Sequence, residues 1–176
     1  MDDAIINRVK TFVKEDYKKS APETKEGLKG HFEIVEKYAN KLCEKEKGSD
    51  KEIVKIAVWL HDIGTIKGDY KNHGISGAKI AGEFLRSLNY PKVKIEQVKH
   101  CIRVHRGSKS GKVETKEAQI LIDADAITHF DEINLLVRMH GKKETLNKLE
   151  RSYDKLSSNA KFLVKNKLEK ARKDLS

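Results

Sequence analysis

The stretch Ile53–Gly64, with the sequence IVKIAVWLHDIG, is the most informative part of the chain. Before His61 it is apolar apart from Lys55, a pattern that predicts a helix buried on nearly every side. The stretch then ends in His61 and Asp62. An ionised carboxylate at the end of a buried helix is costly unless its charge is compensated. A metal ion bound by both side chains would compensate it.

Two other apolar segments also carry a metal-binding residue. His31 lies beside the apolar face formed by Phe32, Val35 and Ala39, and Asp125 lies within the apolar run 120–127. Taken singly, a core or surface His and a capping Asp are common. Three helices that each bring His or Asp into apolar surroundings are better explained together, by one shared ion. Mixed imidazole and carboxylate ligands suit Mn, Fe, Co, Ni or Zn.

The candidate ligands occur in the order His, His-Asp, Asp, which resembles the H…HD…D signature of the HD phosphohydrolase superfamily. His61–Gly64 matches the HDIG variant of that signature. Asp123–Asp125 resembles its D-A-D segment, in which the second Asp is the ligand. The resemblance covers about residues 28–130. It implies an all-α, compact, single-domain helical bundle of the HD type, with His31 completing a metal site at its centre.

Two further histidines are similar to ligands of some HD branches, including the symmetrical diadenosine-tetraphosphate hydrolases. Those branches place two histidines between the HD pair and the last Asp, where they bind a second ion that the HD aspartate bridges. His73 and His105 fall in matching places. His105 is preferred to His100, which a helix would place on another face, because Ile-Arg-x-His resembles a segment of that branch. We expect one bound ion, and a second ion is possible if His73 and His105 are ligands. The alternative is that these two histidines bind no metal.

The resemblance implies hydrolysis of a nucleotide or related small phosphorylated substrate by attack of a metal-bound hydroxide. Asp62 is then both a ligand and a catalytic residue. Phosphoryl oxygens need cations as charge redistributes. The cations close in sequence to the ligands are Lys67, Arg103, Arg106 and Lys109, and ordinary solvated side chains are the alternative for each. Asp69 and Asp123 are the two candidates for a proton donor or ligand partner, and the choice between them stays open.

Two other functions are compatible with the same residues. Some HD proteins are diiron oxygenases, and a non-catalytic nucleotide-sensing module would keep the same ligands. Other family variants fit less well: the guanosine-tetraphosphate hydrolases have Glu-Asp where this chain has Thr65-Ile66. The expected partner is a small phosphorylated compound, first of all a nucleotide, and a homodimer is left open.

Composition favours a single soluble domain. The chain has 176 residues and a net charge of +10. No apolar run is long enough to span a bilayer, and the N-terminus lacks the features of a signal peptide. Cys43 and Cys101 form no C-x-x-C pair and are expected to be buried thiols. These features predict a cytoplasmic protein without a membrane partner.

The basic charge is concentrated at the end of the chain. Residues 142–176 contain eleven Lys and Arg against five Asp and Glu, or +6. Few aromatic residues lie among them, so a solvated helix face is favoured over a nucleic-acid surface. We expect an HD domain over 1–176, with a core at about 25–140 and a basic helical extension at 142–176. The extension holds no candidate ligand, so we do not expect it to determine catalysis.

Hydrophobic periodicity predicts helices nearly throughout. Capping boxes are expected at Ser20–Glu23 and Ser49–Glu52, and residues 65–72 are expected to form a loop. The expected helices are 2–19, 25–47, one that starts at about 51 and ends at 61–64, 73–88, 91–105, 115–128, 129–140, and one or two within 142–174.

Overall fold

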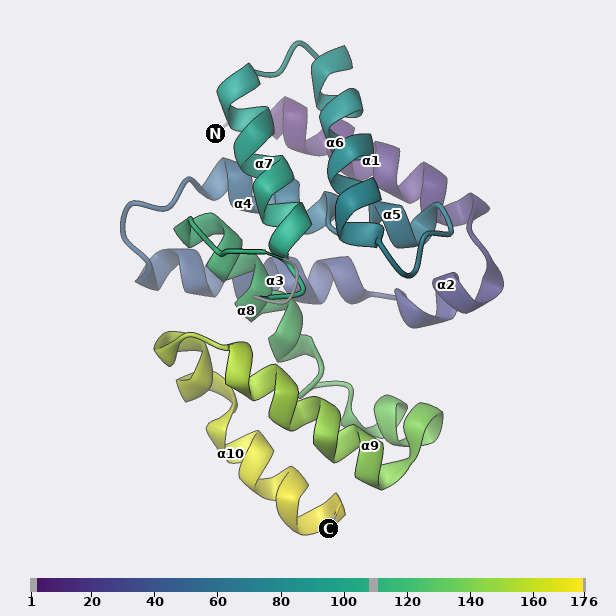
Figure 1. Ribbon diagram of the computed structural model, residues 1–176, viewed down its shortest axis with the longest axis vertical. Helices are drawn as coiled ribbons and strands as arrows, with labels where there is room; N and C mark the ends of the chain where they lie inside the picture. Colours follow the sequence, from purple (N-terminus) through teal and green to yellow (C-terminus); the bar gives the residue numbers. More distant parts are fainter. Residues whose placement is uncertain (1–2, 108–110, 176) are drawn as a thin grey trace.

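The computed structural model describes residues 3–107 and 111–175, and over these residues it contains helices and no strand. The all-α prediction is therefore confirmed. Figure 1 shows the order of the elements. The helices are α1 (Asp3–Lys19), α2 (Pro22–Gly27), α3 (His31–Lys45), α4 (Lys51–Leu60), α5 (Ile63–Ile66), α6 (His73–Ser87), α7 (Lys92–Val104), α8 (Lys116–Thr128), α9 (Ile133–Lys155) and α10 (Ser158–Leu175).

Several helix boundaries differ from the sequence predictions. The helix expected at 25–47 is divided into α2 and α3, because Gly30 adopts a left-handed φ of 71°. The loop expected at 65–72 begins instead with the end of the short helix α5. Residues 133–155 form one element with a kink at Gly141, where φ is 77°. At Gly30 and Gly141 the backbone enters a region that glycine adopts without a steric penalty.

Both predicted capping boxes are wrong in detail. Helix α4 is capped by Asp50, whose Oδ1 accepts hydrogen bonds from the backbone amides of Glu52 at 2.9 Å and Ile53 at 3.3 Å. Helix α2 follows Ala21 and has no side-chain cap, and Ser20 Oγ instead donates to the carbonyl oxygen of Tyr17 at 2.8 Å. The N-cap of α4 is therefore Asp50, one residue after the predicted Ser49.

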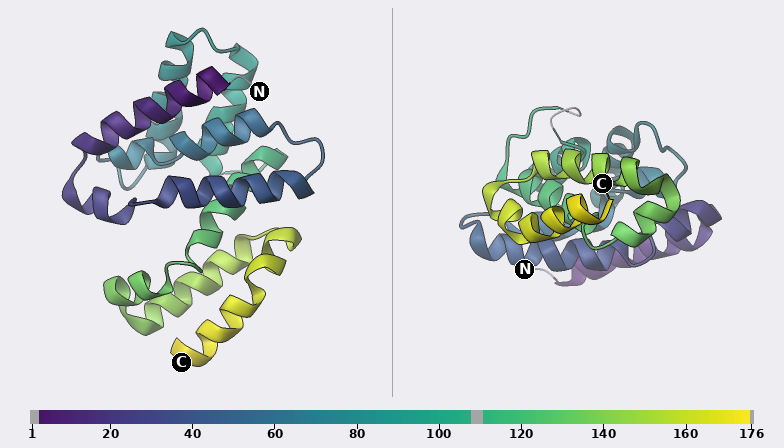
Figure 2. Two further views of the ribbon diagram at one scale, coloured as in Figure 1. Left: turned by 180° about the vertical axis from the view of Figure 1, so that it is seen from behind. Right: turned by 90° about the horizontal axis from the view of Figure 1, so that it is seen from below.

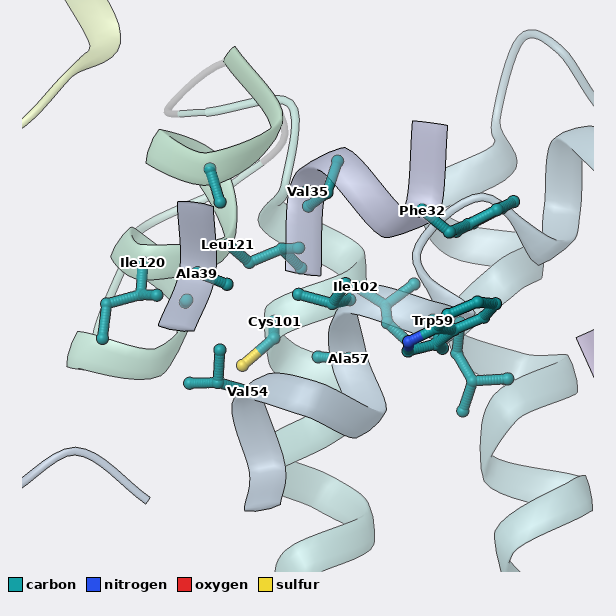
Figure 3. Close-up of a cluster of buried hydrophobic side chains, with 14 of the residues drawn as sticks. Phe32, Val35, Ala39, Val54, Ala57, Trp59, Cys101, Ile102, Ile120 and Leu121 are labelled. Carbon is teal, nitrogen blue, oxygen red and sulfur yellow. The ribbon is translucent and has the colours of Figure 1, made fainter. Parts of the chain in front are cut away.

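Helix α4 lies at the centre of the core, against α1, α3, α7 and α8. Figure 3 shows side chains of α3, α7 and α8 around Ala57 and Trp59 of α4. Trp59 is 2% exposed and stacks on Phe32 of α3, with ring centroids 5.6 Å apart. Cys101 of α7 and Cys43 of α3 are buried free thiols, as predicted. The uniformly apolar sequence of α4 thus reflects contacts on all its sides.

The last two helices form a hairpin at one end of the molecule. Figures 1 and 2 both show α9 and α10 beyond α3 and α8. Buried residues of the two helices, including Leu149 and Val164, pack the hairpin together. Polar contacts join it to α8 and the residue that follows α8, among them His129 Nδ1 with Ser152 Oγ at 2.8 Å and Ser157 N donating to Asp123 Oδ1 at 2.9 Å. None of the helices in the described residues has the length and hydrophobicity to cross a membrane.

Candidate metal centre

The six predicted ligands converge from five separate parts of the fold, and most lie at helix ends. They are His31 at the start of α3, His61 and Asp62 between α4 and α5, His73 at the start of α6, His105 directly after α7, and Asp125 within α8. A helix end lets the chain turn sharply, so a side chain there can point inward while the next element leaves in another direction. The structure brings all six side chains to one place.

The first group of ligand atoms surrounds His61 Nε2. This atom lies 3.2 Å from His31 Nε2, 3.3 Å from Asp62 Oδ2 and 3.8 Å from Asp125 Oδ1. His31 Nε2 lies 3.4 Å from Asp125 Oδ1. His61 is completely buried and His31 is 7% exposed. These four side chains are the H, HD and D residues of the sequence motif.

A second group lies on the other side of Asp62. His73 Nε2 and His105 Nε2 are 3.0 Å apart. Asp62 Oδ1 lies 3.6 Å from His73 Nε2 and 4.0 Å from His105 Nε2. Each carboxylate oxygen of Asp62 therefore faces a different pair of histidines, as a bridging ligand would.

Hydrogen bonds to the backbone orient three of the imidazole rings. His61 Nδ1 lies 2.7 Å from the carbonyl oxygen of Val58. His73 Nδ1 lies 3.1 Å from that of Tyr70, and His105 Nδ1 lies 2.6 Å from that of Ile102. A carbonyl can only accept, so Nδ1 carries the proton in the neutral ring. Nε2 is then left with its lone pair directed at the centre, the arrangement that metal-binding histidines use.

The donor set fits divalent ions. Imidazole nitrogens and carboxylate oxygens bind such ions at about 2.0–2.2 Å, so neighbouring ligands of one ion lie roughly 3 to 3.5 Å apart. The shortest separations in the two groups fall in this range. Two candidate metal-binding triads result: His31, His61 and Asp62, and Asp62, His73 and His105.

Charges in the centre are strongly coupled. Burial alone would lower the pKa of His61, but the Asp62 and Asp125 carboxylates outweigh it and raise that pKa to about 9. Burial would raise the pKa of both carboxyls, yet the adjacent histidines hold each below its usual range. Burial lowers the pKa of His105 to about 4. The two carboxylates therefore favour positive charge at this position.

Close helix packing sets the position of His73. A Cβ atom on Gly64 would lie 2.5 Å from the carbonyl oxygen of His73 and 2.7 Å from Ser76 Oγ. Gly74 is also close to its neighbour, because a Cβ there would lie 3.0 Å from the carbonyl oxygen of Arg103. Glycine at these positions lets α5, α6 and α7 approach closely enough for His73 and His105 to meet.

A cavity of about 450 Å³ opens over the centre. Five of the predicted ligands line it: His31, Asp62, His73, His105 and Asp125. Its walls also carry ionisable groups from the region after α8, including Glu132, Lys148 and Lys155. The cavity has the size of a small-molecule site.

The predicted phosphate-binding cations do not all reach this cavity. Arg106 lines it, with Nη1 donating to the carbonyl oxygen of Lys71 at 3.3 Å. Lys67 Nζ instead lies 2.6 Å from Asp16 Oδ2 on α1, and Arg103 is exposed on α7. Neither Lys67 nor Arg103 is among the described residues that line the cavity. Lys109 lies outside the described residues.

The two candidate proton donors also lie elsewhere. Asp69 Oδ1 accepts a hydrogen bond from the Asn72 amide at 2.8 Å, just before α6. Asp123 is buried and accepts from Ser157 Oγ at 2.5 Å and from Gln119 Nε2 at 2.8 Å. Asp123 therefore fastens the hairpin to α8. Neither carboxylate is among the described residues that line the cavity.

Sequence reasoning missed several residues of the cavity wall. His129 lies four positions after Asp125, so helical spacing could have placed it on the same face. Burial lowers its pKa to about 4. Burial raises the pKa of Glu132. For Lys148 the sequence gives no local signal, because its position depends on how the hairpin folds back.

Comparison with known proteins gives one result. The model of the HD domain family matches residues 28–129, which is more than half of the chain and includes all six candidate ligands. No curated protein and no solved structure matches the chain. With the motif, the helical fold and the matched segment in agreement, the chain belongs to the HD domain family of the metal-dependent phosphohydrolase superfamily.

Proposed function

We propose that this protein is a metal-dependent phosphohydrolase that acts on a nucleotide or a related small phosphorylated compound. The observation that carries the proposal is the position of Asp62, whose two carboxylate oxygens face two separate histidine pairs beneath a cavity with basic side chains. Divalent ions bound there would lower the pKa of water and neutralise phosphoryl charge.

The six ligands divide into two sets in this proposal. His31, His61, Asp62 and Asp125 would hold one ion, and Asp62, His73 and His105 would hold a second. The support is geometric, because the oxygen of Asp62 nearest His61 differs from the one nearest His73. Backbone hydrogen bonds fix the rings of His61, His73 and His105, so they need little rearrangement to bind.

Two other side chains complete the proposed chemistry. Arg106 lines the cavity and offers a guanidinium that matches the oxygens of a phosphate group. Glu132 also lines the cavity, and burial raises the pKa of its carboxyl, so it holds a proton to higher pH than an exposed glutamate. We propose Glu132 as the proton donor to the leaving oxygen, in place of Asp69 and Asp123.

The same six ligands would also suit a diiron oxygenase, and a sensor would need only to bind. The cations in the cavity wall favour a phosphorylated ligand over a neutral one. The deciding experiment is turnover of a nucleotide panel by Mn²⁺-loaded protein under nitrogen. Release of phosphate without oxygen is the expected result, since hydrolysis consumes only water. Turnover that requires oxygen would support the oxygenase, and tight binding without turnover would support the sensor.

A further inference from the structure

One face of α9 points toward the metal cavity. Thr145, Leu149 and Ser152 are buried, and their spacing of four and three residues marks a single helix face. Lys148 lies between them on that face and is only partly exposed, whereas Lys143 on the same helix is exposed. Two lysines of this helix, Lys148 and Lys155, line the cavity of the metal centre, and Lys148 is the one that lies between these buried residues.

Lys148 is a partly buried cation that has no close partner among the residues that the structure describes. Among the described residues, no carboxylate lies within 4 Å of its Nζ and no hydrogen bond joins it to another group. Burial lowers its pKa, although the more distant Asp125 and Glu132 carboxylates act in the opposite direction. A charged group withdrawn from water without such a partner is costly, which is typical of a position that an anionic ligand occupies.

Metal binding would increase the need for an anion. Divalent ions at the centre would take up the negative charge of Asp62 and Asp125. The cavity wall would then present Arg106, Lys148 and Lys155 against the single carboxylate of Glu132 among its described residues. Positive charges would dominate on both the floor and the wall of the cavity, so a ligand with more than one negative charge would be favoured.

We propose that Lys148 is a substrate-binding residue that donates hydrogen bonds to a terminal phosphate group, the phosphoryl oxygens of which also face the metal centre. This proposal deepens the proposed function and rests on it for the identity of the ligand. A terminal phosphate has three free oxygens and two negative charges, enough to contact metal and ammonium together. An internal phosphodiester has two free oxygens and one charge. The residue comes from α9, beyond the matched segment 28–129.

The test measures binding of inorganic phosphate to Mn²⁺-loaded protein by calorimetry. Lys148→Ala is expected to weaken phosphate binding about 10- to 100-fold, the usual effect of losing a charged hydrogen bond, while the manganese stoichiometry stays unchanged. Lys148→Arg should recover most of the affinity because it restores the cation. Lys143→Ala removes the same charge from an exposed position of α9 and should change the affinity less than twofold.

Two further measurements guard against a folding defect and test the ligand class. In wild-type protein, phosphate should slow acetylation of Lys148 by acetic anhydride several-fold and leave Lys143 unaffected, as followed by mass spectrometry. Methyl phosphate should bind about as well as inorganic phosphate, and dimethyl phosphate at least tenfold more weakly. Equal binding of the two esters would overturn the assignment to a terminal phosphate.

The proposal is overturned if Lys148→Ala binds phosphate within twofold of wild type, if phosphate fails to protect Lys148, or if the loaded wild type binds no phosphate. The proposed hydrolysis is judged separately, by phosphate release under nitrogen. Lys148-dependent phosphate binding in a protein that hydrolyses nothing would uphold this proposal and refute the hydrolase. Hydrolysis that is unchanged in Lys148→Ala would support the hydrolase and refute the role of Lys148.

Discussion

The HD core and the C-terminal hairpin both contain many ionisable residues, but they place them differently. In the core, His61 is fully buried and its Nε2 lies 3.3 Å from Asp62 and 3.2 Å from His31. In the hairpin, ion pairs such as Arg172 with Glu150 lie at the surface. Lys148 and Lys155 are exceptions, because they line the core's cavity. Burial of charge, rather than its abundance, therefore marks the functional part of this molecule.

The largest effect is expected from removing the residue on which the core depends most. Asp62→Ala takes away the carboxylate that both histidine pairs face. We expect loss of tightly bound metal from both positions and a fall in turnover on the order of 10³-fold or more. Metal analysis of anaerobically prepared protein and nucleotide turnover measure this. Asp125→Ala should likewise empty the first position. Wild-type metal content in either variant would refute the ligand assignment.

A smaller effect is expected from the second histidine pair. His105→Ala removes a ligand from one side of Asp62 only, so bound metal should fall from two ions to one, with a loss of most of the turnover. His100→Ala is the matched control, because Nε2 of His100 accepts from the Glu114 amide at 3.3 Å, away from the centre. A fully active wild type with one ion per chain, together with an active His105→Ala, would leave a mononuclear site.

The core should also respond to pH through metal binding. Because the pKa of His61 in the metal-free protein is about 9, metal must displace a proton at neutral pH. Metal affinity should therefore rise about tenfold per pH unit from 7 to 8 and level off above 9. Conversely, the stability that protonated His61 gives the metal-free fold is full below pH 6.5 and is lost as pH rises toward 9. Chelator competition across this range measures the affinity; a flat profile would contradict the prediction.

A steric change in the core should cost stability. Gly64→Ala would place a Cβ atom 2.5 Å from the carbonyl oxygen of His73. We expect a loss of about 1–3 kcal/mol in the free energy of unfolding, typical of overpacking, together with weaker binding of the second ion. At Gly27 an added Cβ would meet no atom within 4 Å, so Gly27→Ala should change stability by less than about 1 kcal/mol. Denaturant unfolding compares the stabilities of the two variants. Equal stabilities would show that α6 shifts to accommodate the added methyl group with little loss of stability.

The smallest effect is expected on the outside of the hairpin. Replacing Lys165, Lys167 and Lys170 by Gln should leave turnover of a small nucleotide within about twofold of wild type, since none of them lines the described part of the metal cavity. Lys167 pairs with Asp131 near the surface, so stability should fall by less than about 1 kcal/mol. Steady-state kinetics of this triple variant and of Lys148→Ala, measured side by side, test whether the two surfaces differ in their effect on turnover. A large fall in kcat would show that this surface controls the site.

The helical class and the H, HD and D ligands could be predicted from the residues, and the resemblance to HD proteins added His73 and His105. The helices and the first four ligands follow from local physics: apolar periodicity specifies helices, and a carboxylate such as Asp125 inside an apolar helix requires compensation. The capping boxes failed for an equally local reason, because Asp50 competes with Ser49 for the start of α4. Sequence patterns thus indicated which groups are buried, with errors of several residues at some helix starts, as at α9, which begins at Ile133 where 129 is expected.

How those groups face one another depends on the tertiary structure. In the folded chain each carboxylate oxygen of Asp62 faces a different pair of histidines. Lys67 pairs with Asp16, and Lys148 of α9 lines the cavity. These outcomes depend on the packing of helices far apart in the chain, such as α5 against α6 and α9 against α8. Helical periodicity specifies which side of a helix is buried but carries no information about which distant surface will cover it.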